Sequence, residues 1–160
     1  PMSCAAGVGA WGGFQKRLPQ ARQSFYLVFL DAPAGIEAGF SLAARLADRI
    51  LLVTGPDPAA VRDAARAGQV LEAMGKTNVR LIVNRITRKI GSRLHTTVDD
   101  IMDTAGLPLI GVVPEDPQVT LAAARGRPLI TSSRKGAAAA CRRIARRLQG
   151  IPQPIPRRGF

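Results

Sequence analysis

Two polar residues and one polar loop follow aliphatic runs in this sequence, and their types suit a phosphate or metal site. Asp31 follows FYLVFL and opens the turn DAPAG, Asn84 stands near the end of VRLIVNR, and the loop PEDP occupies residues 114–117. A carboxylate can hold Mg²⁺ or its bound water, and a tight turn with glycine can approach a γ-phosphate. The sequence therefore predicts a metal-assisted phosphate site at Asp31, with the alternative that Asp31 only caps a following helix.

Four short aliphatic runs are expected to form the strands that position these residues. They lie at residues 25–31, 49–54, 79–85 and 109–115. None of them alternates polar with apolar side chains, so both faces of each strand should be buried, as in a parallel sheet. An aliphatic core suits a chain in which 46% of the residues are hydrophobic and only 4% are aromatic.

The segments between the later runs carry the signals of helix ends. One helix should take Asp57 as its N-cap, with a proline at its first position, and stop at Gly75. A second should begin at Thr96 or Thr97, carry acidic residues in its first turn, and stop at Gly106. The second and third runs are thus each followed by a helix.

A third helix is expected over residues 133–149, where Ala137, Cys141, Ile144 and Leu148 form one apolar stripe. Strands that alternate with helices predict an α/β fold with a doubly wound, mainly parallel sheet flanked by helices. Ligands of such sheets bind beyond the carboxyl ends of the strands. The three polar features should therefore lie along one rim of the sheet.

Composition argues against several other classes of protein. The net charge of +12 would suit a nucleic-acid binder, but the arginines are scattered and no aromatic side chains are interleaved with them, so we expect no nucleic-acid partner. Cys4 and Cys141 have no CxxC or histidine-rich context, which fits a reducing compartment without a zinc site. No apolar run reaches the roughly 18 residues of a membrane span, and residues 1–24 lack the pattern of a signal peptide.

Five blocks of the chain resemble, in order and spacing, the MinD family within the MinD/ParA group of P-loop NTPases. They are FLDAPAGIEAGF, ADRILLVTGPDPAAVRDA, LIVNRI, VDDIMDTAGLPLIGVVPED and ARRLQG. The resemblance implies a P-loop NTPase-like fold, ATP and Mg²⁺ as cofactors, and a part in bacterial division-site placement. It divides the chain into a poorly defined segment at residues 1–24, a nucleotide-binding portion at 25–150, and a Pro/Arg tail at 151–160.

The resemblance also implies roles for single residues on the phosphate side of the site. The DxPAG segment corresponds to the family's Walker B and switch II region. Asp31 would then be a catalytic residue that helps to coordinate Mg²⁺, and Gly35 would lie near the γ-phosphate.

On the base side, the resemblance implies a second group of residues. Asn84 corresponds to the family's adenine-contacting asparagine, with Arg85 beside it. An asparagine side chain has both an acceptor and donors, so it can match the N6/N7 edge of adenine. Pro114, Glu115 and Asp116 correspond to the loop that flanks the base. The alternative for Asn84 is a turn residue at a strand end.

The chain departs from the family where the phosphates should be held. A P-loop needs backbone N–H groups and a lysine to neutralise the phosphates, but the lysines, at positions 16, 76, 89 and 135, stand in no such motif. We therefore expect a portion of a MinD-like ATPase, incomplete at its N-terminus and inactive alone. The alternatives are a degenerate, non-catalytic MinD/ParA-like regulatory or scaffold module and a ParA-type DNA-associated partition ATPase.

The family resemblance further implies partners and a location. MinD proteins form homodimers through the nucleotide face, bind the division inhibitor and the topological-specificity partner of the Min system, and associate peripherally with the inner face of the cell membrane. Arg62 and Asp63 match the family's partner-binding helix, whereas Ala65 replaces an acidic residue. The tail IPQPIPRRGF contains three prolines and cannot form a terminal amphipathic helix. We therefore expect a cytoplasmic location, with membrane association only in the complete protein.

Overall fold

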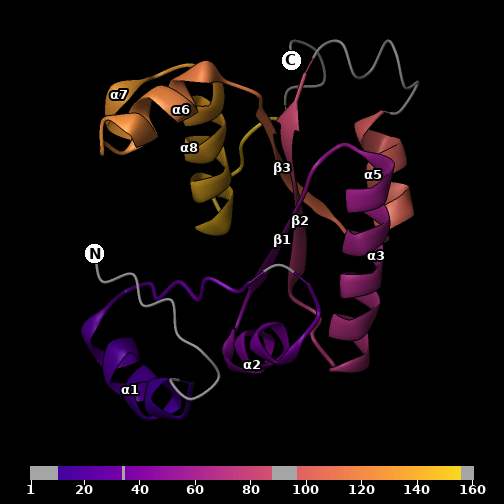
Figure 1. Ribbon diagram of the computed structural model, residues 1–160, viewed down its shortest axis with the longest axis vertical. Coiled ribbons are helices and arrows are strands. Elements are labelled where there is room, and N and C mark those ends of the chain that lie inside the picture. Colours follow the sequence, from indigo (N-terminus) through magenta and orange to yellow (C-terminus); the bar gives the residue numbers. More distant parts are fainter. Residues whose placement is uncertain (1–10, 34, 88–96, 156–160) are drawn as a thin grey trace. The chain divides into compact units, whose positions relative to one another are not determined.

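The computed structural model describes residues 11–33, 35–87 and 97–155, which form two compact units, Pro1–Ala47 and Asp48–Phe160 (Figure 1). The first contains α1 (Trp11–Ser24) and α2 (Ala38–Leu46). The second contains, in order, β1 (Ile50–Thr54), α3 (Pro58–Ala73), β2 (Val79–Ile86), α5 (Val98–Ala105), β3 (Leu109–Pro114), α6 (Pro117–Ala124), α7 (Leu129–Ser132) and α8 (Gly136–Leu148).

The second unit is built on a parallel sheet in the order β1-β2-β3, as the unbroken aliphatic runs predict. Its central strand is buried on both faces, because Leu81, Ile82 and Val83 are successive residues and all three are buried. The edge strand differs from the prediction, since the side chain of Val53 in β1 is 57% exposed. Only a central strand has neighbours that cover it on all sides.

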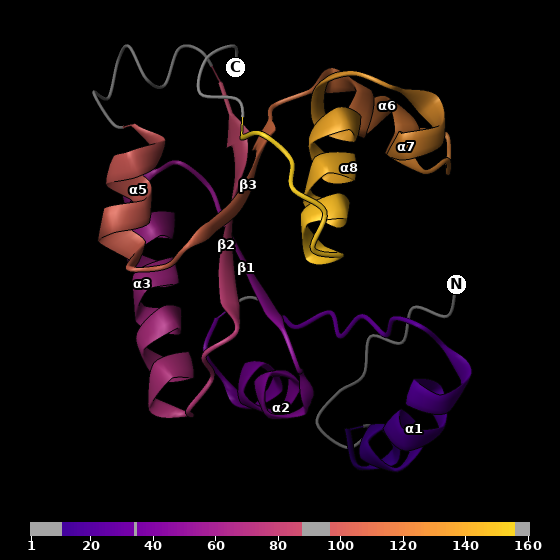
Figure 2. The same cartoon turned by 180° about the vertical axis from the view of Figure 1, so that it is seen from behind.

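Helices cover both faces of this sheet, which confirms the doubly wound α/β prediction. Figures 1 and 2 show α3 and α5 on one face and α8, joined by α6 and α7, on the other. The largest fully buried side chains come from α3, β2 and α5: Leu71, Leu81, Val83 and Ile101. The opposite face is closed by a cluster of Ile82, Ile110 and Ile144, against which Leu51, Val113 and Leu148 pack.

The predicted helix ends are confirmed by their hydrogen bonds. The carboxylate of Asp57 accepts from the Ala60 N–H at 2.9 Å at the start of α3. Thr97 and Asp100 form a reciprocal capping box at the start of α5, while Thr96 lies outside the described residues. Gly106 then ends α5 in the left-handed conformation, with φ of 64°. Such caps are local interactions, so residue types a few positions apart suffice to specify them.

The strand predicted over residues 25–31 is wrong, because the segment after α1 has no regular secondary structure. Its side chains are largely exposed: Phe25 by 65%, Tyr26 by 95% and Phe29 by 78%. A strand exists only through hydrogen bonds to a neighbouring strand. No strand of the described residues pairs with this segment, so its hydrophobic sequence has no sheet to join.

The helices α1, α2, α6 and α7 have no counterpart among the predicted helices, and α8 differs from its prediction in where it begins. The helix α6, which begins directly after Asp116, was not predicted, although an Asp-Pro pair is a usual helix start. The helix α8 begins at Gly136 rather than at Ser133, which is extended. None of the helices in the described ranges is both long and apolar enough to cross a lipid bilayer.

Candidate functional site

The carboxyl ends of β2 and β3 bring the predicted base-side residues together. Asn84 pairs with Val113 across the two strands, and Ile86 pairs with Pro114. The register shifts between these two pairs, so Arg85 is the extra residue of a bulge. Bulges are common beside functional sites because they redirect a side chain and end the regular pairing. Two of the three polar features that were expected on one rim, Asn84 and the PEDP loop, therefore lie at neighbouring strand ends in the second unit.

Arg85 has a backbone conformation that is unfavourable for its side chain. Its φ is 61°, and among the described residues it alone combines a positive φ with a side chain. The left-handed conformation costs a residue with a Cβ roughly 1–2 kcal/mol. The Arg85 N–H donates to Asn84 Oδ1 at 3.0 Å, which offsets part of this cost. Strain of this kind is concentrated at functional sites.

Glu115 joins the loop after β3 to the end of β2. Its backbone N–H donates to the Ile86 carbonyl at 3.0 Å, and its Oε1 lies 3.4 Å from Arg85 Nη2. Both side chains of this ion pair are exposed, so the pair itself contributes little to stability. It nevertheless keeps the Arg85 guanidinium next to the loop that was predicted to flank the base.

Asp116 is half-buried and caps two helices. Its Oδ1 accepts from the Gln118 N–H at 2.9 Å at the start of α6, and its Oδ2 accepts from the Ala137 N–H at 3.0 Å at the start of α8. The Asp-Pro pair in the sequence could have revealed the first of these bonds. The second joins residues 21 positions apart, so no local sequence signal indicates it.

The two predicted phosphate-side residues, Asp31 and Gly35, belong to the first unit. Asp31 is exposed, and the following helix α2 has Glu37 as its N-cap, so Asp31 does not cap it. Gly35 has φ of 95°, a conformation that favours glycine. Within the described residues, no group of three or more His, Cys, Asp or Glu side chains could hold a metal ion. A cation at Asp31 would need further ligands from elsewhere.

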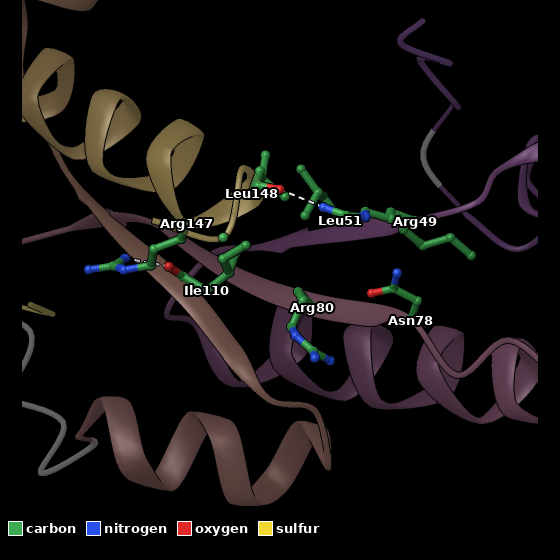
Figure 3. Close-up of a pocket in the computed structure, with 9 residues that line it drawn as sticks. Arg49, Leu51, Asn78, Arg80, Ile110, Arg147 and Leu148 are labelled. Atoms are coloured by element: carbon green, nitrogen blue, oxygen red, sulfur yellow. Dashed lines mark hydrogen bonds between the residues drawn. The ribbon is translucent and has the colours of Figure 1, made fainter. Parts of the chain in front are cut away.

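A cavity of about 260 Å³ lies at the amino ends of β1 and β2, the opposite end of the sheet from Asn84. Figure 3 shows Arg49 and Arg147 at its wall, with hydrogen bonds to the carbonyls of Leu148 and Ile110. Burial, together with nearby Arg143, lowers the pKa of Arg147. Because these guanidinium groups bond backbone carbonyls, they hold α8 and the chain after it on the sheet.

Cys141 in α8 is the one cysteine that the described residues include. It is free and half-buried, and burial raises the pKa of its thiol. A raised pKa favours the protonated thiol, which is a poor nucleophile. The geometry therefore gives no support to cysteine-based catalysis in this part of the chain.

Comparison with known proteins gives the same family as the sequence motifs. No protein-family model matches the chain. A MinD septum site-determining protein of Nephroselmis olivacea is 40% identical over 143 residues, which are 86% of this chain and 52% of that protein. The solved structure of the MinD cell division protein of Aquifex aeolicus is 35% identical, with a TM-score of 0.83, and the match covers 91% of this chain and 63% of that one.

Two further solved structures connect the fold to a partner and to a nucleotide. The MinC:MinD cell division protein complex of Aquifex aeolicus matches with a TM-score of 0.83 and 33% identity over 98% of this chain and 64% of that one. MinD of Pyrococcus horikoshii complexed with Mg-ADP matches with a TM-score of 0.67 and 25% identity over 82% of this chain and 55% of that one. The chain spans about half the length of the curated relatives it matches. By sequence and by fold, the chain belongs to the MinD family of septum site-determining proteins.

Proposed function

We propose that this chain is part of a MinD-type ATPase that acts in bacterial division-site placement, with ATP and Mg²⁺ as its cofactors. The observation that carries the proposal is the grouping of Asn84, Arg85 and Glu115 at the carboxyl ends of two parallel strands, in a chain of the MinD family. Ligands of open α/β sheets bind at this edge. A MinD homologue with the same fold was solved with Mg-ADP.

Asn84 would recognise the adenine base in this site. Its Oδ1 already accepts the Arg85 N–H, which fixes the side chain and leaves the amide NH₂ and a second lone pair for the base. Arg85, Pro114 and Glu115 would flank the ring, because the Glu115 N–H holds their loop against the end of β2. The bulge at Arg85 would then serve to aim Asn84 away from the sheet.

Asp31 and Gly35 would act on the phosphate side. An exposed carboxylate before a turn fits Mg²⁺, which proteins bind through one or two carboxylates together with phosphates and water. Bound Mg²⁺ would neutralise charge on the phosphates during transfer. The glycine at position 35 would let the backbone approach the γ-phosphate. The phosphate cradle itself would come from a Walker A segment, a motif that this sequence does not contain.

In the complete protein, ATP binding would drive homodimerisation through the nucleotide face, and hydrolysis would reverse it. A cytoplasmic protein of this type would associate peripherally with the membrane only in its ATP-bound form. The match to a MinC:MinD complex supports a division inhibitor as a partner. Arg62 and Asp63 on α3 are exposed and could take part in that contact, whereas Ala65 departs from the family pattern.

The decisive experiment restores the missing motif. The chain is fused to the N-terminal part of a MinD relative, which supplies the Walker A segment, to give a completed chain. Magnesium-dependent phosphate release is measured for the chain alone, the completed chain and the completed chain with Asp31→Ala. We expect turnover only in the completed chain, because phosphoryl transfer depends on positioning and charge neutralisation. Asp31→Ala should lower it about 100-fold or more.

The matched control is Asp103→Ala in the completed chain. Asp103 is also an exposed carboxylate, but it lies on α5. Equal losses in both variants would show that the effect at Asp31 is not specific. An inactive completed chain that still binds ATP and a Min partner would instead favour the second candidate, a non-catalytic regulatory or scaffold module. Salt-dependent retention on DNA would favour the ParA-type alternative.

A further inference from the structure

The carboxylate of Asp116 is shared between two helices that are distant in sequence. Its two oxygens accept the Gln118 N–H of α6 and the Ala137 N–H of α8, at 2.9 Å and 3.0 Å. Ala137 is completely buried, so its N–H group would be costly to leave without an acceptor. A negative charge at two helix N-termini is also favoured by both helix dipoles. Both oxygens of the Asp116 carboxylate are therefore bonded to backbone N–H groups of the protein itself.

Gly136 makes the contact with α8 possible. Its φ is 55°, and a Cβ at this position would lie 2.2 Å from Asp116 Oδ2 and 3.1 Å from Asp116 Cγ. Real Cβ atoms do not approach that closely, so any other residue would push the carboxylate away from the Ala137 N–H. The close approach of Asp116 and the start of α8 thus depends on glycine at position 136.

The loop that ends β3 is consequently fixed from two sides. On one side, the Glu115 N–H donates to the Ile86 carbonyl at the end of β2. On the other side, Asp116 is bound to the start of α8. The helix α8 is itself anchored through Ile144 in the cluster with Ile82 and Ile110. A displacement of Asp116 would therefore move the loop relative to Asn84.

We propose that Asp116 is a positioning residue, which holds the loop of Pro114 and Glu115 between β2 and α8, and that its carboxylate does not bind the nucleotide. This inference rests on the nucleotide site proposed above. It differs from the expectation that Asp116 flanks the base as a ligand, because both carboxylate oxygens bind backbone N–H groups of the protein. Gly136, which is absent from that predicted site, becomes as important for the loop as Asp116.

The test breaks the contact from both sides. Gly136→Ala retains Asp116 but displaces its carboxylate from the Ala137 N–H. Asp116→Asn keeps one side-chain oxygen, so that one of the two helices can still be capped. Amide hydrogen exchange at Ala137 and Gln118 is measured in the chain, and ATP affinity is measured in the completed chain. We expect Gly136→Ala to accelerate exchange at Ala137 and to weaken ATP binding about fivefold to tenfold. Asp116→Asn should accelerate exchange at one of the two amides and also weaken binding.

Gly126→Ala is the matched control. Gly126 has φ of 61°, close to that of Gly136, but a Cβ there would have nothing within 4 Å. It imposes the same backbone strain without touching Asp116, so exchange at Ala137 and ATP affinity should remain unchanged relative to the unmodified protein. An equal loss of affinity in this control would show that general destabilisation, not the loop, is responsible.

Two kinds of failure are distinguishable. If Asp116→Asn weakens ATP binding while Gly136→Ala does not, Asp116 is a direct ligand and the positioning role is wrong. Unchanged exchange at Ala137 in Gly136→Ala would show that the contact itself does not hold α8. If the unmodified completed chain binds no ATP, the proposed function fails, and the exchange data still report separately on whether Asp116 joins the two helices.

Discussion

The sheet and α8 pack closely at Gly111, and this packing supports a quantitative prediction. A Cβ at this position of β3 would lie 2.3 Å from Ile144 Cγ1, 2.7 Å from Ile144 Cδ1 and 3.3 Å from Arg147 Nη1. Carbon atoms in contact are normally about 3.5–4.0 Å apart. Gly111→Ala therefore requires α8 to withdraw by more than an ångström, or Ile144 to change its rotamer.

Neither adjustment is available at low cost. Ile144 is buried in the cluster with Ile82 and Ile110, so withdrawal of α8 would open the core on this face of the sheet. Inserting a methyl group into a well-packed core usually costs about 1–3 kcal/mol. We expect Gly111→Ala to lower the free energy of unfolding by an amount in this range. The measurement is urea unfolding followed by far-UV circular dichroism, at several protein concentrations.

A double-mutant cycle tests the cause. Ile144→Ala alone should cost about 2–5 kcal/mol, because it leaves a cavity. In that background the added methyl of Gly111→Ala meets no Cγ1 or Cδ1, so it should cost close to nothing and can even fill part of the cavity. The loss in free energy of unfolding in the double variant should therefore be smaller than the sum of the two single losses by about 1–3 kcal/mol. Strictly additive losses would refute the packing argument.

Three further predictions concern other parts of the chain. Arg85→Asn should raise the free energy of unfolding by about 0.5–1 kcal/mol, because asparagine tolerates the left-handed conformation and the exposed ion pair that is lost contributes little. A lower free energy of unfolding in the variant, measured by thermal unfolding, would contradict this. Hydrogen bonds from the backbone and side chain of Thr97 lower the pKa of Asp100 below its ordinary 3.8. The stabilising effect of the Asp100 carboxylate on α5 is therefore present above pH 3.8 and is lost as the pH falls through the lowered pKa. Asp100→Asn should weaken this acid dependence in unfolding titrations. Finally, the chain alone should bind a hydrophobic dye strongly through its exposed segment, and Phe25→Ser with Phe29→Ser should reduce the fluorescence; an unchanged signal would place the dye elsewhere.

The sequence alone determined those features that depend on neighbouring residues. The aliphatic runs that became β1, β2 and β3 were identified from their unbroken hydrophobic character. The starts of α3 and α5 followed from Asp57 and Thr97, because a cap binds N–H groups only two or three residues away. The edge of the sheet where Arg85 and Glu115 meet followed from the rule that parallel strands present their carboxyl ends together.

Tertiary structure decided whatever depends on residues far apart in the chain. The segment at residues 25–31 has the composition of a strand, but strand formation requires a hydrogen-bonded neighbour, which the described residues do not provide. The left-handed backbone of Arg85 arises from the shifted register between two strands, and the second helix capped by Asp116 begins 21 residues away from it. The requirement for glycine at positions 111 and 136 comes from atoms of Ile144 and Asp116 that only the folded chain brings within reach.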